Sequence, residues 1–276
     1  MFPATNRGAL ERYRIPIEWK GELSEIDPRD REAIPFTRPE TEAATAADIA
    51  EIDRLQEVLY AQARYALLVI LQGLDTSGED GTIRRVFGPI NPVGAIATSF
   101  KKPTPHELAH DFLWRIHKAV PAAGMIGIFN RSHYEDVLVH RVHGLVPPDT
   151  IEARYRQINA FEHHLTENDV ILLKFLLHIS KKEQKARLEA RLQDPTKRWK
   201  FNPDDLAERR HWGDYLSAYE VALRRCSTQW APWFVVPADH KWYRNAVVAR
   251  IVRVSLEALD LTYPPEMPGL DKVRID

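Results

Sequence analysis

The chain has 276 residues, of which 44% are hydrophobic and 28% charged, and 38 basic against 39 acidic residues give a formal net charge of −1. This composition is typical of a folded globular protein, and it argues against a disordered chain and against a uniformly basic nucleic-acid-binding protein. No apolar run approaches the roughly 20 residues that span a bilayer, and the single cysteine, Cys226, excludes an internal disulfide or a cysteine-based metal site. We therefore expect a cytoplasmic protein with an inert thiol and with no membrane or nucleic-acid partner.

Residues 1–60 are predicted to form an N-terminal arm that ends in a packing helix. From Thr45 onward, apolar residues recur about every 3.6 positions, at Ile49, Ile52, Leu55 and Leu59. This period indicates a helix with one apolar face, which could also serve as an oligomer contact.

Residues 61–276 are predicted to form a single α/β domain. Strands are expected over residues 65–72, 96–100, 125–129, 170–179 and 233–236. Helices are expected over residues 105–120, 150–165 and 240–258, after Ser180, which with Glu183 forms a capping box, and in a segment that ends at Arg225. Strands that alternate with helices predict a parallel sheet covered on both faces, and hence a three-layer αβα fold.

A glycine-rich loop, Gly73-Leu-Asp-Thr-Ser-Gly78-Glu-Asp-Gly-Thr82, follows the first strand. Between a strand and a helix, the amides of such a loop converge on an anion. The spacing from Gly73 to Gly78 is that of a phosphate-binding P-loop, but Glu79 and Asp80 stand where that motif has Lys and Ser or Thr. Two unit charges 4 Å apart interact by about 4 kcal/mol at a dielectric near 20. A glutamate in place of the lysine changes the sign of this interaction with a bound phosphate. The alternative is an ordinary glycine turn.

Several sequence blocks beyond about residue 45 resemble polyphosphate kinase family 2. They are Gly73-x-Asp75-x-x-Gly78, Asn91-Pro92, Asp111-Phe-Leu-Trp-Arg-Ile-His117, Phe129-Asn-Arg-Ser-His-Tyr-Glu-Asp136, Glu189-Ala-Arg-Leu192 and Trp230-Ala-Pro-Trp233. The resemblance implies a P-loop kinase-like fold with a helical lid at about 180–210. It implies transfer of phosphate between inorganic polyphosphate and a nucleotide with Mg²⁺, in a homotetramer or homodimer. Asn130 resembles the branch that acts on both AMP and ADP, with guanine nucleotides as a further option.

Together with this resemblance, the pattern of charged residues assigns roles to individual side chains. Mg²⁺ is expected on Asp75 and Glu135, and catalysis is assigned to Asp75, Asn130, Arg131, Glu135 and Arg141. The nucleotide is expected to contact Asn130, Arg131, Asp136 and Arg141. Phosphate or polyphosphate is expected to contact Thr76, Ser77, Gly78, Glu79, Asp80, Gly81, Thr82, Arg84, Arg85, Lys101, Arg187, Arg191 and Lys200. The alternatives are a turn-capping Asp75, a surface ion pair for Arg131, and a solvated acidic pair at Glu135 and Asp136.

The lid segment is strongly basic. Residues 174–210 hold eleven basic and six acidic residues, a net charge of +5. Polyphosphate carries about one charge per phosphate and needs a concentrated track of cations. Arg187 and Arg191 lie four residues apart, which places them on one helix face. The alternative is a solvated helix of mixed charge.

The resemblance also implies a lysine at position 79, so Glu79 has three competing explanations. They are a lineage with altered or lost activity, an engineered substitution, or compensation by Arg84, Lys101 or Lys102. One alternative function is therefore a non-catalytic homologue that binds polyanions or nucleotides. A remote alternative is a zinc hydrolase, because His106-Glu107-Leu-Ala-His110 matches the H-E-x-x-H motif.

Overall fold

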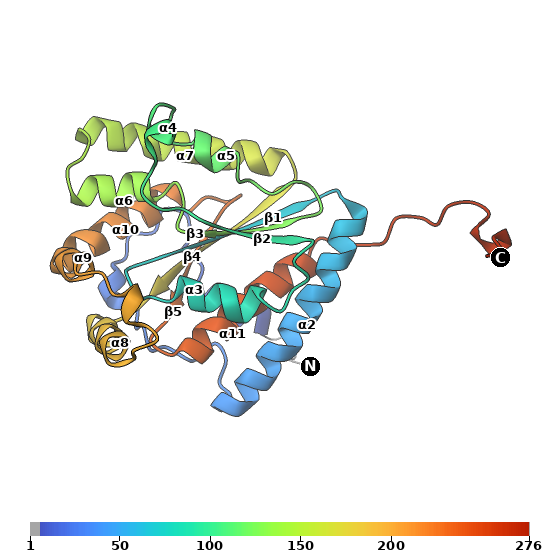
Figure 1. Cartoon of the computed structure of the whole chain (residues 1–276), viewed down its shortest axis with the longest axis horizontal. Helices are drawn as coiled ribbons and strands as arrows, with labels where there is room; N and C mark the ends of the chain where they lie inside the picture. The colour runs from blue at the N-terminus through green and yellow to red at the C-terminus, as the bar shows by residue number, and fades with distance from the viewer. Residues whose placement is uncertain (1–5, 276) are drawn as a thin grey trace.

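A computed structural model describes residues 6–275 and shows a five-stranded parallel sheet with helices on both faces (Figure 1). The strand order is β2-β3-β1-β4-β5. The strands are β1 (Ala66–Gly73), β2 (Ala95–Ser99), β3 (Ile126–Asn130), β4 (Val170–His178) and β5 (Trp233–Pro237). The predicted three-layer αβα fold is therefore confirmed, with each strand end within two residues of its predicted place.

The central strand β1 is buried along its whole length because it pairs with strands on both sides. Leu67 lies opposite Ile126 of β3 and Ile171 of β4. Alternate residues of β1 enter different cores, with Val69 in the core beneath one helical layer and Ile70 in the core beneath the other. A strand covered on both faces reads as a continuous apolar run, and this is the pattern from which it was predicted.

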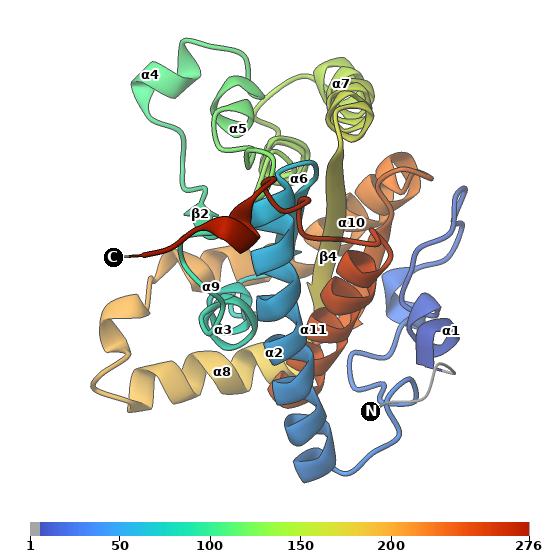
Figure 2. The same ribbon diagram turned by 90° about the vertical axis from the view of Figure 1, so that its right-hand side faces the viewer.

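Helices form a layer on each face of the sheet, and Figure 2 shows the two layers from the side. One layer contains α2 (Arg38–Gln62), α3 (Glu79–Thr82) and α11 (Lys241–Glu257). The other contains α5 (Trp114–His117), α6 (Glu135–Val142), α7 (Pro148–Glu167) and α10 (Trp212–Cys226). Another short helix, α4 (Pro105–Leu108), lies beside this second layer (Figure 1).

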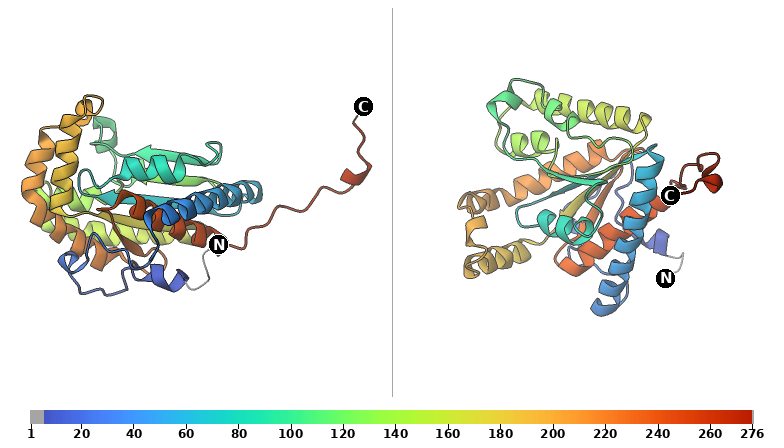
Figure 3. Two further views of the ribbon diagram at one scale, coloured as in Figure 1. Left: turned by 90° about the horizontal axis from the view of Figure 1, so that it is seen from below. Right: turned by 45° about the vertical axis from the view of Figure 1, so that its right-hand side comes forward.

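The N-terminal segment begins with α1 (Asn6–Glu11) and then runs along the outer edge of β5. The amide of Ile15 donates to the carbonyl of Trp233, and the amide of Val235 donates to the carbonyl of Tyr13, both at 2.8 Å. After α11 the chain leaves the body as an extended tail (Figure 3).

The predicted continuous helix over 105–120 is wrong, because the structure has two short helices there. Thr104 and Glu107 form a capping box that starts α4, which ends at Leu108. The Asp111 carboxylate then accepts the amide of Leu113 and starts a new turn before α5. In this segment, caps that satisfy local amides therefore decide where the helices begin and end, and the apolar period does not.

The lid segment projects from the sheet at the carboxyl ends of the strands (Figure 1). It contains α8 (Lys181–Gln193) and α9 (Asp204–Glu208), and a short 3₁₀ turn at Arg198–Lys200 lies between them. Ser180 caps α8 as predicted, since its hydroxyl accepts the amide of Glu183 at 3.0 Å. The reciprocal half of the box is missing, because the Glu183 carboxylate binds Arg187 instead.

Candidate active site

The glycine loop turns sharply between β1 and α3. Thr76 and Gly78 have left-handed backbones, with φ of 67° and 114°, and the Ser77 amide donates to the carbonyl of Leu74 at 2.9 Å. A side chain is strained at such a φ, so Gly78 needs to be glycine. The Thr76 hydroxyl is buried and has no hydrogen-bond partner among the described residues. The loop thus has the strained backbone and the unsatisfied polar atom that a bound anion would use.

The Glu79 side chain folds back over this loop. Its carboxylate accepts the amide hydrogen of Gly78 at 3.0 Å and is almost completely buried. Burial raises the pKa of the Glu79 carboxyl, while the charge of Arg131 opposes that rise. Glu79 therefore occupies one of the loop's own amide donors and places an acid beside the position expected for phosphate.

Two arginines hold the carbonyl side of the loop. Arg187 of α8 donates to the carbonyls of Thr76 at 2.9 Å and Ser77 at 2.8 Å. Arg244 of α11 donates to the same Ser77 carbonyl at 3.0 Å. Because only 8% of the Arg187 side chain is exposed, its charge serves the loop itself and is not displayed on the lid surface. Arg244 was missed by the sequence reasoning, since nothing in the local sequence connects α11 with the loop.

Arg131 joins the two carboxylates that were assigned to the metal. It directly follows β3 with a left-handed φ of 62°. Its guanidinium contacts the Asp75 carboxylate at 2.6 Å and the Glu135 carboxylate at 3.1 Å, and Gln72 also donates to Glu135 at 2.9 Å. Glu135 and Asp75 raise the pKa of Arg131 above its usual value. The structure thus brings together three of the predicted catalytic residues.

These residues line a cavity of about 390 Å³ between the loop and the lid. Its acidic members are Asp75, Glu135, Asp204, Asp205 and Glu208, and its basic members are Lys102, Arg131 and Arg209. Trp212, Tyr215 and Tyr219 of α10 add aromatic surface. The sequence did not identify most of these lid residues as part of the site, because the prediction for residues 174–210 depended on their net positive charge.

A divalent metal ion fits the donor set of this cavity. Mg²⁺ is commonly bound through one or two carboxylates together with substrate phosphates and water. Asp75 and Glu135 offer such carboxylates with 24% and 17% of their side chains exposed. Among residues 6–275, no group of three His, Cys, Asp or Glu residues is arranged to hold a metal without such further ligands.

Other predicted site residues lie around the cavity or away from it. Asn130 donates to the Asp80 carboxylate at 2.7 Å, which ties the end of β3 to α3. Asp136 is buried beside Arg154 of α7, at 3.8 Å, and Arg141 is exposed on the last turn of α6. Neither Asp136 nor Arg141 belongs to the described lining of the cavity.

The remaining predicted phosphate-binding residues lie outside the described lining of the cavity. Arg84, Arg85 and Lys101 are exposed, and Arg191 pairs with the Asp205 carboxylate at 3.2 Å. Lys200 lies in a short 3₁₀ turn, and its side chain is outside the described part of the structure. Thr82 is buried, and its hydroxyl donates to the Gly78 carbonyl at 3.1 Å, so it stabilises the first turn of α3. Gly81 precedes Thr82 in that same helix.

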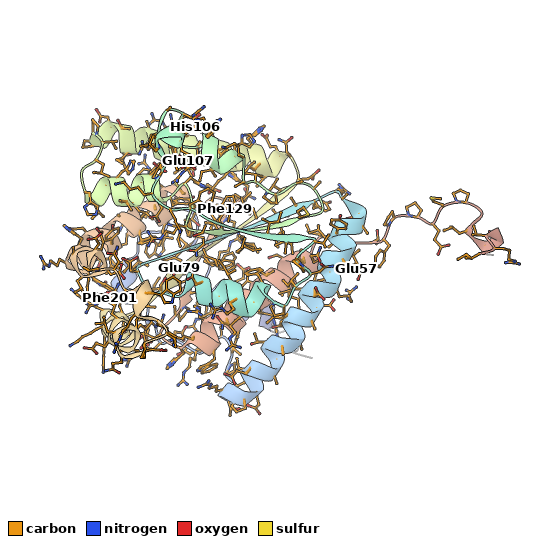
Figure 4. All side chains as sticks on the ribbon, viewed as in Figure 1. Glu57, Glu79, His106, Glu107, Phe129 and Phe201 are labelled. Atoms are coloured by element: carbon orange, nitrogen blue, oxygen red, sulfur yellow. The ribbon has the colours of Figure 1, made fainter. Side chains whose placement is uncertain are left out.

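The His106 and His110 rings lie 5.0 Å apart, but within the described part of the chain no further His, Cys, Asp or Glu completes a metal site with them, which argues against the zinc-hydrolase alternative. Figure 4 shows His106 and Glu107 in a different helical layer from Glu79. Glu107 caps α4 by accepting the Thr104 amide at 2.7 Å, and the His110 ring stacks on Trp114 with centroids 3.8 Å apart. Because α4 ends at Leu108, the two histidines do not share a continuous helix face.

A phosphate loop at the carboxyl end of the central strand, facing a lid across a carboxylate-lined cavity, is the arrangement of P-loop kinases. The family model described as Polyphosphate kinase 2 (PPK2) matches residues 36–263. The chain therefore belongs to the polyphosphate kinase 2 family. No helix in the described part of the chain has both the length and the apolar character needed to cross a membrane.

Similar proteins agree with this assignment. The AMP/ADP-polyphosphate phosphotransferase of Meiothermus ruber is 46% identical over 97% of this chain and 100% of the relative. The ADP-polyphosphate phosphotransferase of Rhodopseudomonas palustris is 42% identical over 81% of this chain and 82% of the relative. The crystal structure of polyphosphate kinase 2 from Arthrobacter aurescens has a TM-score of 0.91 and 45% identity over 94% of this chain and 92% of that chain.

Proposed function

We propose that the protein is a kinase that transfers a phosphoryl group between inorganic polyphosphate and AMP or ADP. The observation that carries this proposal is the position of Arg131, which joins Asp75 and Glu135 at the cavity beside the phosphate loop. Phosphoryl transfer depends mainly on positioning and on neutralising the charge of the transferred group. The membership of the chain in a family of polyphosphate kinases supports the choice of donor.

Each residue of the cluster has a role in this reaction. The loop amides around Gly78 hold phosphate oxygens, and the Arg131 guanidinium leaves its carboxylates to bind the transferring group through two parallel hydrogen bonds. Asp75 and Glu135 would hold Mg²⁺. When bound, the metal ion supplies positive charge to the phosphate oxygens, and it would offset the acidic lining of the cavity.

The polymer and the nucleotide would approach the cavity from different surfaces. Lys181, Lys182 and Lys185 of α8 are exposed, so they offer a basic surface to polyphosphate beside the loop. Trp212 and Tyr215 line the cavity and offer aromatic faces for a nucleobase. The names of the relatives support AMP and ADP as acceptors, with guanine nucleotides as a second option.

The assembly and location of the protein remain predictions. A homodimer or homotetramer follows from the resemblance to the family, and light scattering on the purified protein would measure it. The single cysteine and its burial suit a reducing cytoplasm.

The activity can be tested by incubating the purified protein with polyphosphate, Mg²⁺ and either AMP or ADP, and measuring ADP and ATP. We expect the unaltered chain to form both products. Arg131→Met should lower the rate about 100-fold, because it removes the cation that neutralises the transferred group. The matched control is Arg225→Met. Arg225 lies near the end of α10 and pairs with Glu152 of α7. Well-folded protein with no activity in either the unaltered chain or Glu79→Lys would refute the kinase assignment.

One observation favours a second function, a homologue that binds polyphosphate or nucleotides without turnover. Glu79 places a buried carboxylate in the phosphate loop, and such a charge opposes a bound phosphate. Activity that appears in Glu79→Lys but not in the unaltered chain would support this second function. Activity in both would show that another cation replaces the lysine.

A further inference from the structure

Arg244 lies against the glycine faces of the phosphate loop. It belongs to the first turn of α11, and only 2% of the residue is exposed. A methyl group added at Gly78 would lie 1.8 Å from one terminal nitrogen of Arg244, and one added at Gly81 would lie 3.2 Å from the other. The two glycines therefore leave the space into which this guanidinium packs.

The charge of Arg244 is linked to that of its neighbours around the loop. Burial and the nearby charge of Arg187 lower the pKa of Arg244 to about 10, whereas the charge of Glu79 acts in the opposite direction. Two arginines thus share the Ser77 carbonyl. Arg187 is paired with the Glu183 carboxylate at 2.7 Å, and Glu79 is the acid whose charge favours Arg244. Screening by solvent is weak at such depth, so these charges act on the loop over several ångströms.

We infer that Arg244 is a positioning residue. From behind the loop it supplies the positive charge that other P-loops obtain from a lysine, at the position that Glu79 occupies in this chain. Glu79 and Arg244 then form one charge-exchanged unit, in which the acid on the loop balances the base on α11. This inference rests on the proposed function, because it concerns how the loop of a phosphoryl-transfer enzyme holds phosphate. Of the compensating residues considered from the sequence, Lys102 lines the cavity, whereas none of the hydrogen bonds described for the loop comes from Arg84, Lys101 or Lys102.

If the loop simply lacked its lysine, Glu79→Lys would restore phosphate binding, whereas in a charge-exchanged pair it would not. Glu79→Lys alone would place a third cation beside Arg244 and Arg187 and would remove the acid whose charge favours Arg244. We therefore expect Glu79→Lys to bind polyphosphate no better than the unaltered chain. When Arg244→Met is added, the repulsion is relieved and the loop regains the usual P-loop charge, so the double variant should bind better than either single variant.

The experiment is a double-mutant cycle of Glu79→Lys and Arg244→Met, read by calorimetric binding of tripolyphosphate and by kcat and KM for phosphoryl transfer. Arg244→Met should weaken tripolyphosphate binding at least tenfold and raise the KM for polyphosphate, and Arg244→Lys should recover part of the loss. The matched control is Arg250→Met, which changes another buried arginine of α11 that binds Asp48 at 2.8 Å, away from the loop. This control should lower the melting temperature and leave tripolyphosphate binding unchanged.

Several results would overturn the inference. They are additive effects of the two substitutions, equal binding by Arg244→Met and Arg250→Met, or no tripolyphosphate binding by any variant. Coupling in the binding measurement without phosphoryl transfer by any variant would instead refute the proposed function and leave the coupled pair in place. The two failures are therefore distinguishable.

Discussion

A buried ion pair between β4 and α7 gives the sharpest stability prediction. Lys174 of β4 and Glu162 of α7 are both fully buried, and the ammonium group contacts the carboxylate at 2.5 Å. Lys174 also donates to the Tyr134 hydroxyl at 2.9 Å and to the Cys226 carbonyl at 2.7 Å. Tyr134 in turn donates to Glu162 at 2.8 Å, so all three donors of the lysine are satisfied inside the protein.

Lys174→Met should remove the base and leave Glu162 buried without its main partner. Breaking one side of a buried pair costs about 3–5 kcal/mol. At roughly 2–3 °C per kcal/mol for a chain of this size, the melting temperature should fall by about 6–15 °C. Thermal and urea unfolding followed by circular dichroism would measure the change.

The control for this prediction is Arg225→Met, which breaks the exposed pair with Glu152 and should cost at most about 1 kcal/mol. Adding Glu162→Gln to Lys174→Met should recover part of the loss, because it removes the unpaired charge. If Lys174→Met destabilised the protein no more than Arg225→Met does, the reasoning about buried charge would be refuted.

The same pair makes a prediction about pH. Burial alone would raise the pKa of Glu162, but the charges of Lys174 and His133 hold it below its usual value. A carboxyl group with a lowered pKa in the folded state stabilises the protein above its ordinary pKa, and that stability is lost as the pH falls through the folded-state value. The unaltered chain should therefore lose more stability between neutral pH and about pH 3 than Lys174→Met does.

Three further predictions concern single residues. Asp75→Asn should lower kcat about 100-fold and raise the Mg²⁺ concentration needed for half-maximal rate, because it removes a carboxylate that would hold the metal. An unchanged Mg²⁺ requirement would contradict the role of Asp75 as a metal ligand. Cys226 is buried, and burial raises its thiol pKa to about 12, so a thiol reagent should label it rapidly in urea and hardly at all in the folded protein; fast labelling of folded protein would show that the site opens. Burial lowers the pKa of His178, so below about pH 6.5 the unfolded chain binds more protons than the folded chain. Stability should therefore fall as the pH drops below about 6.5. Between pH 7 and 5, His178→Gln should lose less stability than the unaltered chain.

The parallel sheet could be predicted because its physics is local to each strand. A strand covered on both faces needs a continuous apolar run; β1 shows such a run, and β4 shows one that Lys174 interrupts. The phosphate loop could be predicted for a similar reason, since the glycine spacing and the strand-to-helix position are adjacent in the chain. Asp75, Arg131 and Glu135 could be placed near one another because parallel strands end at one edge of the sheet.

The contacts that decide charge at the loop depend on residues far apart in the chain. The sequence of its helix predicts that Arg187 is a basic residue of the lid surface. In the structure it binds the carbonyl of Ser77, which lies 110 residues away in the chain. Arg244 is 167 residues away and binds the same atom. No local pattern reveals either contact, because the fold brings α8 and α11 to the loop only after the whole sheet has formed.

This difference changes how residue 79 should be understood. A motif assigns the charge of a P-loop to one position, yet a bound phosphate responds to the sum of nearby charges. Around this loop, Arg131 is paired with Asp75 and Glu135, and Arg187 is paired with Glu183. Arg244 adds a further buried positive charge, and Glu79 is the buried acid whose charge favours it. A lysine at residue 79 would add repulsion beside the buried cations Arg187 and Arg244, and such repulsion lowers stability. The acid at residue 79 is therefore compatible with a working phosphate loop as long as Arg244 stays in place, and an alteration of either residue should be judged against the other.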